Sequence, residues 1–178
     1  FGILIMETSK LLPSELKIFN FAKKEVSLFG EYLISNLPRI SEIAINKEDS
    51  VKVDLSFYLE NDKTPCVKGI IELNIVLECQ RCLEALQKQL NVNFNLAFVR
   101  NEQQAKGLDS QYEIYVIEGD ELATIDLITD EILLSLPMAP SHNYECNLNK
   151  DKQEIVEEKR ENPFTILKNI KIADVGKE

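Results

Sequence analysis

Alternating apolar and polar residues predict three long strands in the middle of the chain. In residues 51–60, apolar side chains occupy every odd position from Val51 to Leu59, and mostly polar side chains lie between them. Residues 67–79 and 86–99 repeat this two-residue period, which is typical of a strand with one buried face. Because only short polar segments connect these strands, neighbouring strands can pair only in the antiparallel orientation. The pattern therefore predicts a β-meander with one apolar face.

A shorter strand and a helix are expected after this meander. Residues 112–116 alternate again, beyond a polar loop at 101–111. Apolar side chains recur at helical spacing in residues 125–136, with Leu133 and Leu134 widening the apolar face, and Thr124 or Asp126 is suited to cap the helix. We expect this helix to cover the sheet. The predicted fold is α+β, an antiparallel and partly closed sheet covered by one main amphipathic helix.

The first 50 residues have a mixed pattern. Residues 28–34 favour a strand kinked at Gly30, and residues 37–45 favour a short helix with Pro38 in its first turn. No secondary structure can be assigned to the rest of this part.

We expect one α+β domain over residues 1–146, followed by a tail. Residues 147–161 contain nine charged residues and few large apolar ones, which indicates an acidic linker. Residues 162–178 begin with Asn162 as a helix cap and Pro163 at the first helical position, and Phe164 lies on the apolar side of the short helix. This helix is suited to docking on the domain or on a partner.

The net charge of −10 is concentrated in one part of the chain. Residues 101–161 contain 15 Asp and Glu against 5 Lys and Arg, so the remaining residues are close to neutral. This charge disfavours broad electrostatic binding of nucleic acid. Lys23, Lys24 and Arg81 leave room for a local basic patch, although clusters this small are more often ordinary surface.

Neither a membrane span nor a signal peptide is indicated. The longest stretch without a charge, residues 132–144, is 13 residues long and contains two prolines. The apolar start of the chain lacks a basic flank, and we expect Met6 to be the natural first residue. We therefore expect a cytoplasmic protein whose thiols stay reduced, where metal or redox chemistry is favoured over disulfides.

The candidate chemistry centres on four residues. Cys79 and Cys82 form a C-x-x-C motif between two predicted strands, and His142 and Cys146 follow the predicted helix. A C-x-x-C at such a turn is typical of half a tetrahedral zinc site, and the second pair is suited to complete it. Two alternatives stay open: the cysteines are small buried side chains without a metal, or Cys79 and Cys82 form a redox pair.

Enzymatic motifs are absent from the sequence. It contains one histidine, no glycine-rich phosphate loop and no G-x-S-x-G elbow, so we expect neither catalysis nor a small-molecule substrate. Asp126, Asp130 and Glu131 are expected on the solvated face of the helix, and partner recognition is their functional alternative. Arg81 is expected to pair with Glu78 or Glu84, with a phosphate contact as its alternative.

Four blocks in order resemble the YceD family: residues 77–82 around the C-x-x-C motif, residues 125–132, residues 136–146, and Asn162-Pro163-Phe164. The resemblance implies a bacterial, non-enzymatic factor for 23S ribosomal RNA accumulation and large ribosomal subunit biogenesis. We expect its partners to be precursor large-subunit RNA or large-subunit ribosomal proteins. The resemblance implies two cysteine pairs in many relatives, whereas His142 here stands in place of one cysteine of the second pair. Arg81, Asp126, Asp130, Glu131 and Phe164 are the candidate partner-binding residues.

Overall fold

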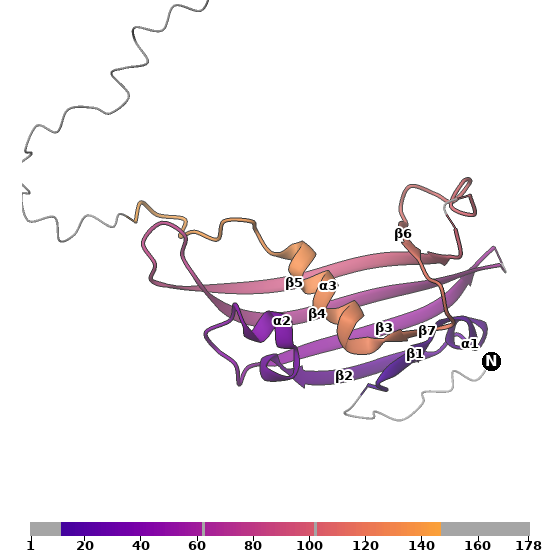
Figure 1. Ribbon diagram of the computed structural model, residues 1–178, viewed down its shortest axis with the longest axis horizontal. Helices are drawn as coiled ribbons and strands as arrows, with labels where there is room; N and C mark the ends of the chain where they lie inside the picture. The colour runs from indigo at the N-terminus through magenta and orange to yellow at the C-terminus, as the bar shows by residue number, and fades with distance from the viewer. Residues whose placement is uncertain (1–11, 62, 102, 147–178) are drawn as a thin grey trace, which may run out of the picture. The chain divides into compact units, whose positions relative to one another are not determined.

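Three long antiparallel strands form the centre of the structure, a computed structural model that describes residues 12–61, 63–101 and 103–146. They are β3 (Ser50–Glu60), β4 (Thr64–Glu78) and β5 (Ala85–Val99). Two shorter strands extend this sheet, β2 (Ser27–Leu33) beside β3 and β6 (Glu113–Val116) beside β5 (Figure 1). The predicted meander, the strand at residues 28–34 and the α+β class are confirmed.

The sheet departs from the expectation at its β6 edge. β6 runs parallel to β5, with Leu96 paired to Glu113, whereas the other three pairs are antiparallel. The polar segment after Val99 is long enough to bring the chain back alongside β5 before β6 begins, which a tight turn could not do. β2 and β6 lie at opposite edges and do not pair, so the sheet is open rather than partly closed.

The structure also contains several short elements that were not predicted from the sequence, most of them in the N-terminal region. β1 (Glu15–Lys17) pairs with β7 (Glu121–Ala123) in a separate two-stranded sheet, and α1 (Ile18–Lys23) follows β1 directly. A 3-10 turn, η1 (Ile34–Asn36), leads into α2 (Pro38–Ser41), which is shorter than the helix expected at residues 37–45. β1 and β7 are only three residues long, so neither shows a readable period.

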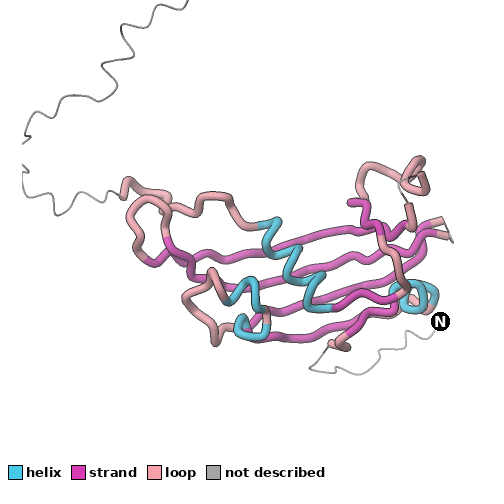
Figure 2. The backbone as a smooth tube through the Cα atoms, in the orientation of Figure 1, coloured by secondary structure: helices cyan, strands magenta, loops and turns pink. Residues whose placement is uncertain are grey.

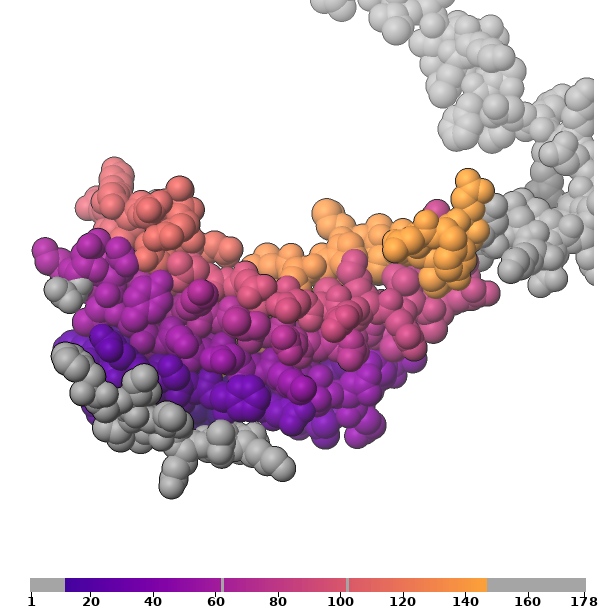
Figure 3. Space-filling view, turned by 180° about the vertical axis from the view of Figure 1, so that it is seen from behind, coloured from indigo at the N-terminus to yellow at the C-terminus, as the bar shows by residue number. Residues whose placement is uncertain are grey.

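The main helix, α3 (Thr124–Ser135), lies across one face of the sheet, on the side that also carries α2 (Figure 2). It buries Leu127, Ile128 and Ile132 in the core, which confirms the predicted cover. The other face of the sheet carries exposed polar side chains such as those of Lys52 and Glu72. Figure 3 looks onto this face, opposite the side that carries α3.

The orientation of α3 corrects three details. Glu131, expected in solvent, is only 6% exposed, because it lies at the i+3 and i+4 positions from Ile128 and Leu127 in the buried stripe. Leu134, expected on the apolar face, is 76% exposed. The N-cap residue is Ala123 without a side-chain bond, and the Thr124 hydroxyl instead donates to the carbonyl of Pro13.

The expected linker at residues 147–161 and the expected helix beyond it lie outside the described residues, as does Phe164. The domain boundary at residue 146 therefore stays a prediction. Within the described ranges, no helix is long and apolar enough to cross a membrane.

Candidate metal centre

The turn between β4 and β5 holds the C-x-x-C motif in a compact loop. The backbone N–H of Cys79 donates to the carbonyl of Glu84 at 2.9 Å, and that of Leu83 donates to the carbonyl of Cys79 at 2.8 Å. Leu83 adopts a left-handed backbone with φ of 62°, a conformation that favours glycine. These bonds close the turn tightly enough to bring the sulfurs of Cys79 and Cys82 to the same side.

A second segment, residues 136–146, returns from α3 to this turn and is held there by hydrogen bonds. The backbone N–H of Gln80 donates to the carbonyl of Pro140 at 2.8 Å. The Arg81 guanidinium donates to the carbonyl of His142 and, at 3.0 Å, to that of Tyr144. Arg81 thus joins the two segments.

The four residues predicted as metal ligands converge at this junction. Their ligand atoms all lie within 4.8 Å of one another. The Sγ atoms of Cys79 and Cys146 are 3.7 Å apart, and Cys82 Sγ lies 3.4 Å from His142 Nδ1. Zinc bonds of about 2.3 Å to sulfur and about 2.0 Å to nitrogen would place tetrahedral sulfurs about 3.8 Å apart, and sulfur about 3.5 Å from nitrogen. These two spacings match those expected around a tetrahedral zinc ion.

His142 is oriented as a metal ligand would be. Its Nε2 lies 3.3 Å from the backbone carbonyl of Ala85, which accepts a hydrogen bond from the N–H of that nitrogen and leaves Nδ1 free to face the sulfurs. Tyr144 stacks on the imidazole, with ring centroids 4.8 Å apart. A carbonyl on the second ring nitrogen is the usual arrangement around metal-bound histidines, because it fixes both the tautomer and the ring orientation.

The surroundings of Cys79 and Cys82 shift the pKa values of their two thiols in opposite directions. Burial raises the pKa of Cys79, but hydrogen bonds from the backbones of Arg81, Cys82 and His142 outweigh burial and lower this pKa to about 5. A backbone hydrogen bond from Glu84 lowers the pKa of Cys82, but burial and the neighbouring sulfurs outweigh it and raise this pKa to about 11. The turn thus stabilises a thiolate at Cys79, and thiolate is the form that binds metal.

The cluster has the composition of a structural site. Cys79 and Cys146 are buried, and Cys82 is partly exposed. With four protein donors, a tetrahedral ion would keep no position for a reactive water, in contrast to catalytic zinc sites, which keep one open. The arrangement can hold two distant segments of the chain together.

The other candidate residues are placed differently. Arg81 makes no ion pair with Glu78 or Glu84, because its guanidinium is engaged by backbone carbonyls. Asp130 pairs with Arg39 at 2.5 Å, so this carboxylate is engaged within the domain. Asp126 is exposed, as expected. The sequence did not predict that Arg81 binds backbone carbonyls or that the Ala85 carbonyl binds His142. Every residue has a backbone carbonyl, so no sequence pattern marks the ones that form such contacts.

Cys66 lies apart from the metal centre. It is fully buried beside Ala97 and Tyr112, and burial raises the pKa of its thiol to about 11. This placement makes Cys66 a natural control residue.

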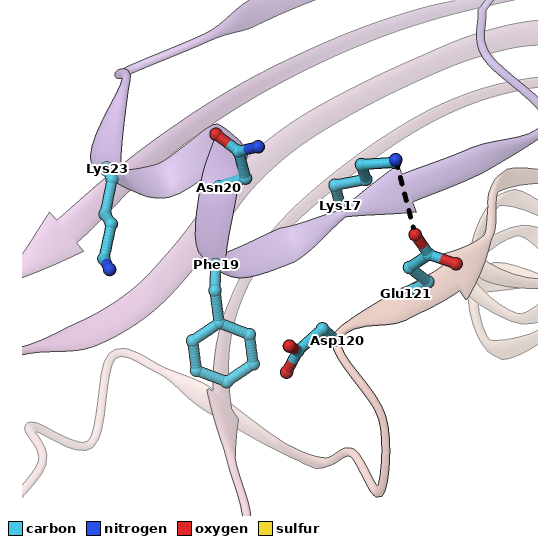
Figure 4. A pocket seen from close by; sticks show the side chains of 6 residues that line it. All are labelled: Lys17, Phe19, Asn20, Lys23, Asp120 and Glu121. Atoms are coloured by element: carbon cyan, nitrogen blue, oxygen red, sulfur yellow. Dashed lines mark ion pairs between the residues drawn. The ribbon is translucent and has the colours of Figure 1, made fainter.

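Lys23, considered above for a basic patch, lines a cavity of about 380 Å³ beside α1 (Figure 4). Phe19, Asn20 and Lys17 also line it, and Lys17 pairs with Glu121 at 3.6 Å. Asp120 contributes a second carboxylate. Because the lining mixes two lysines with two acids, it does not form a basic patch.

Comparisons with known proteins place the chain in a family. Residues 67–171, which include all four cluster residues, match the family model described as large ribosomal RNA subunit accumulation protein YceD. A relative from Haemophilus influenzae with the same description is 35% identical over 169 residues, covering 90% of this chain and 96% of the relative. No solved structure matches. The chain belongs to the YceD family.

Proposed function

We propose that this protein is a non-enzymatic factor for 23S ribosomal RNA accumulation and large ribosomal subunit biogenesis. It acts in the cytoplasm by binding precursor large-subunit RNA or large-subunit ribosomal proteins. Family membership is the observation that carries this proposal, because the Haemophilus influenzae relative is named for large ribosomal RNA subunit accumulation and aligns over 90% of the chain.

We further propose that the factor carries a structural zinc ion held by Cys79, Cys82, His142 and Cys146. Three thiolates and one imidazole are a common zinc donor set, and the sulfur–sulfur and sulfur–nitrogen distances support it. When bound, the ion supplies a cross-link and no reaction. The residues of this chain then keep the β4–β5 turn and residues 136–146 together as one rigid surface.

A thiol redox protein is the second candidate, favoured by the backbone hydrogen bonds that lower the pKa of Cys79, the first cysteine of the C-x-x-C motif, to about 5. Redox C-x-x-C motifs usually start a helix, whereas this motif turns between two antiparallel strands. Thiol trapping after equilibration in glutathione buffers separates the candidates, because only the redox protein would interconvert a Cys79–Cys82 dithiol and disulfide near the cytoplasmic potential.

Depletion of the protein in its own cell tests the biological function. We expect the large subunit and its 23S RNA to fall relative to the small subunit in a sedimentation profile. A plasmid copy with Cys66→Ser should restore both, whereas a copy with Cys82→Ser should restore less. Unchanged large-subunit levels after depletion would contradict the proposal.

A further inference from the structure

Exposed apolar side chains gather on the two segments that build the metal centre. Met138, Tyr144 and Leu83 are 104%, 61% and 58% exposed, among the highest values for large apolar side chains in the described ranges. Ile45, 57% exposed, lies at the same end of the sheet, where its N–H donates to the carbonyl of Val76. Single exposed apolar residues are ordinary, but several at one place mark an interaction site.

The same two segments carry exposed acids. We define the knuckle surface as the apolar side chains of Leu83, Met138 and Tyr144 together with the acids that flank them, Glu78, Glu84 and Glu145. The Arg81 guanidinium donates to the carbonyl of Tyr144 at 3.0 Å, which places Tyr144 beside the turn that carries Leu83 and Glu84. The apolar and acidic groups therefore form one surface.

The charge of this surface selects the class of partner. Arg81 is the only Lys or Arg in residues 78–85 and 136–146, and its guanidinium is bonded to the carbonyls of His142 and Tyr144. Three exposed glutamates on the same two segments as the apolar side chains repel a phosphate backbone and attract cations. Long-range attraction of this kind speeds association with a partner of opposite charge and disfavours other partners.

The backbone under the knuckle surface is already ordered. The Gln80–Pro140 bond fixes one segment on the other, and the stacking on His142 holds the Tyr144 ring. An anchored tyrosine loses little conformational entropy on binding, so a short partner segment can bind with useful affinity.

We propose that the knuckle surface binds a cationic segment of a protein, in which lysines or arginines flank apolar side chains. The inference rests on the proposed function and deepens it, because it assigns protein rather than RNA as the partner at this site. Apolar side chains of the segment would pack on Tyr144, Leu83 and Met138, and its cations would pair with the flanking glutamates.

The test uses the full chain purified with zinc and three fluorescent probes. The first is a short peptide in which lysines flank a central phenylalanine and leucine, the second replaces every lysine by glutamate, and the third is a single-stranded RNA. We expect only the lysine peptide to bind, with affinity that falls as salt increases. Amide shifts in nuclear magnetic resonance spectra should map to residues 78–85 and 138–145.

Two variants and one control make the result decisive. The pair Glu84→Gln with Glu145→Gln should weaken peptide binding at least fivefold without touching the metal ligands, and Tyr144→Ala should weaken it similarly. Phe29→Ala removes a 52% exposed aromatic side chain from β2 and should leave binding unchanged. Far-ultraviolet circular dichroism and zinc content confirm that each variant is folded.

Three outcomes would overturn the inference: RNA binding at residues 78–85 and 138–145, peptide shifts that map elsewhere, or an equal loss with Phe29→Ala. These outcomes are distinct from failure of the proposed function, which the depletion experiment tests in the cell. A normal subunit profile together with peptide binding at the knuckle surface would refute the ribosomal function and keep the surface.

Discussion

The sulfur atoms of Cys79 and Cys146 lie 3.7 Å apart, although 67 positions separate them in the chain. The meander places the first sulfur at the β4–β5 turn, and α3 directs the chain back so that the second reaches it. A metal bound here would close a long loop, which lowers the entropy of the unfolded chain relative to an open one. The packing of α3 on the sheet thus determines where the metal centre forms.

Arg81 should strengthen metal binding without contacting the metal. Its guanidinium holds the carbonyls of His142 and Tyr144, so Arg81→Gln should weaken zinc affinity about tenfold or more, as loss of a supporting contact around a metal site does. Competition with a chromophoric chelator measures this. Arg39→Gln, which removes only the pair with Asp130, is the control, and equal affinities in both variants would argue against the role of Arg81.

Leu83 carries backbone strain that glycine would relieve. Its φ of 62° is unfavourable for side chains with a Cβ atom by about 1 kcal/mol or more. Because alanine keeps the Cβ atom and glycine does not, Leu83→Gly should be more stable than Leu83→Ala by about 1 kcal/mol. Urea unfolding of the two variants gives the difference, and a less stable glycine variant would show that the turn is not strained.

Gly69 is required because Phe94 lies directly over it on the paired strand. A Cβ atom at residue 69 would stand 2.0 Å from the ring of Phe94. Gly69→Ala should therefore reduce the free energy of unfolding by about 2–3 kcal/mol, as overpacked cores do. Gly119→Ala is the matched control, since its new Cβ atom would meet nothing closer than 3.9 Å. Calorimetry should show a clearly lower Tm only for the first variant.

Glu131 should make stability depend on pH. Burial, with the charges of Glu113 and Asp130, raises the pKa of this carboxyl to about 7 from its ordinary 4.5. The folded protein therefore binds the Glu131 proton more tightly than the unfolded chain does. This tighter binding contributes fully to the free energy of unfolding below pH 4.5, and the contribution is lost as pH rises through 7.

Replacing that carboxyl by an amide tests this dependence. Glu131→Gln should stabilise the protein by about 1–3 kcal/mol at pH 8 and hardly at all near pH 4.5. Asp126→Asn, on the exposed side of α3, provides the control. The prediction is refuted if the gain from Glu131→Gln is the same at both pH values.

Much of the sheet could be predicted because its strands are long. Val51 to Leu59 alternate over a whole strand, and Ile71 and Val92 continue the same buried face on the next two. β1 and β7 could not be found, since three residues contain no period, and the parallel pairing of β6 depends on the path of an irregular loop.

The ligand residues of the candidate site could be predicted from the sequence, but the contacts that hold them in place could not. Cysteine and histidine are recognisable from spacing, and the four residues do converge. The contacts that hold them use backbone carbonyls, such as that of Ala85, which every residue possesses and no sequence pattern marks. Glu131 was misplaced for a related reason, because a helix can bury a polar residue within an otherwise apolar stripe.

Elemental analysis of the protein purified without chelator is the most direct test of the metal centre. We expect about one zinc per chain in the unaltered protein and in Cys66→Ser, and loss of most zinc in Cys79→Ser and Cys146→Ser. Substoichiometric zinc in the unaltered protein, or equal zinc in Cys66→Ser and Cys146→Ser, would contradict it.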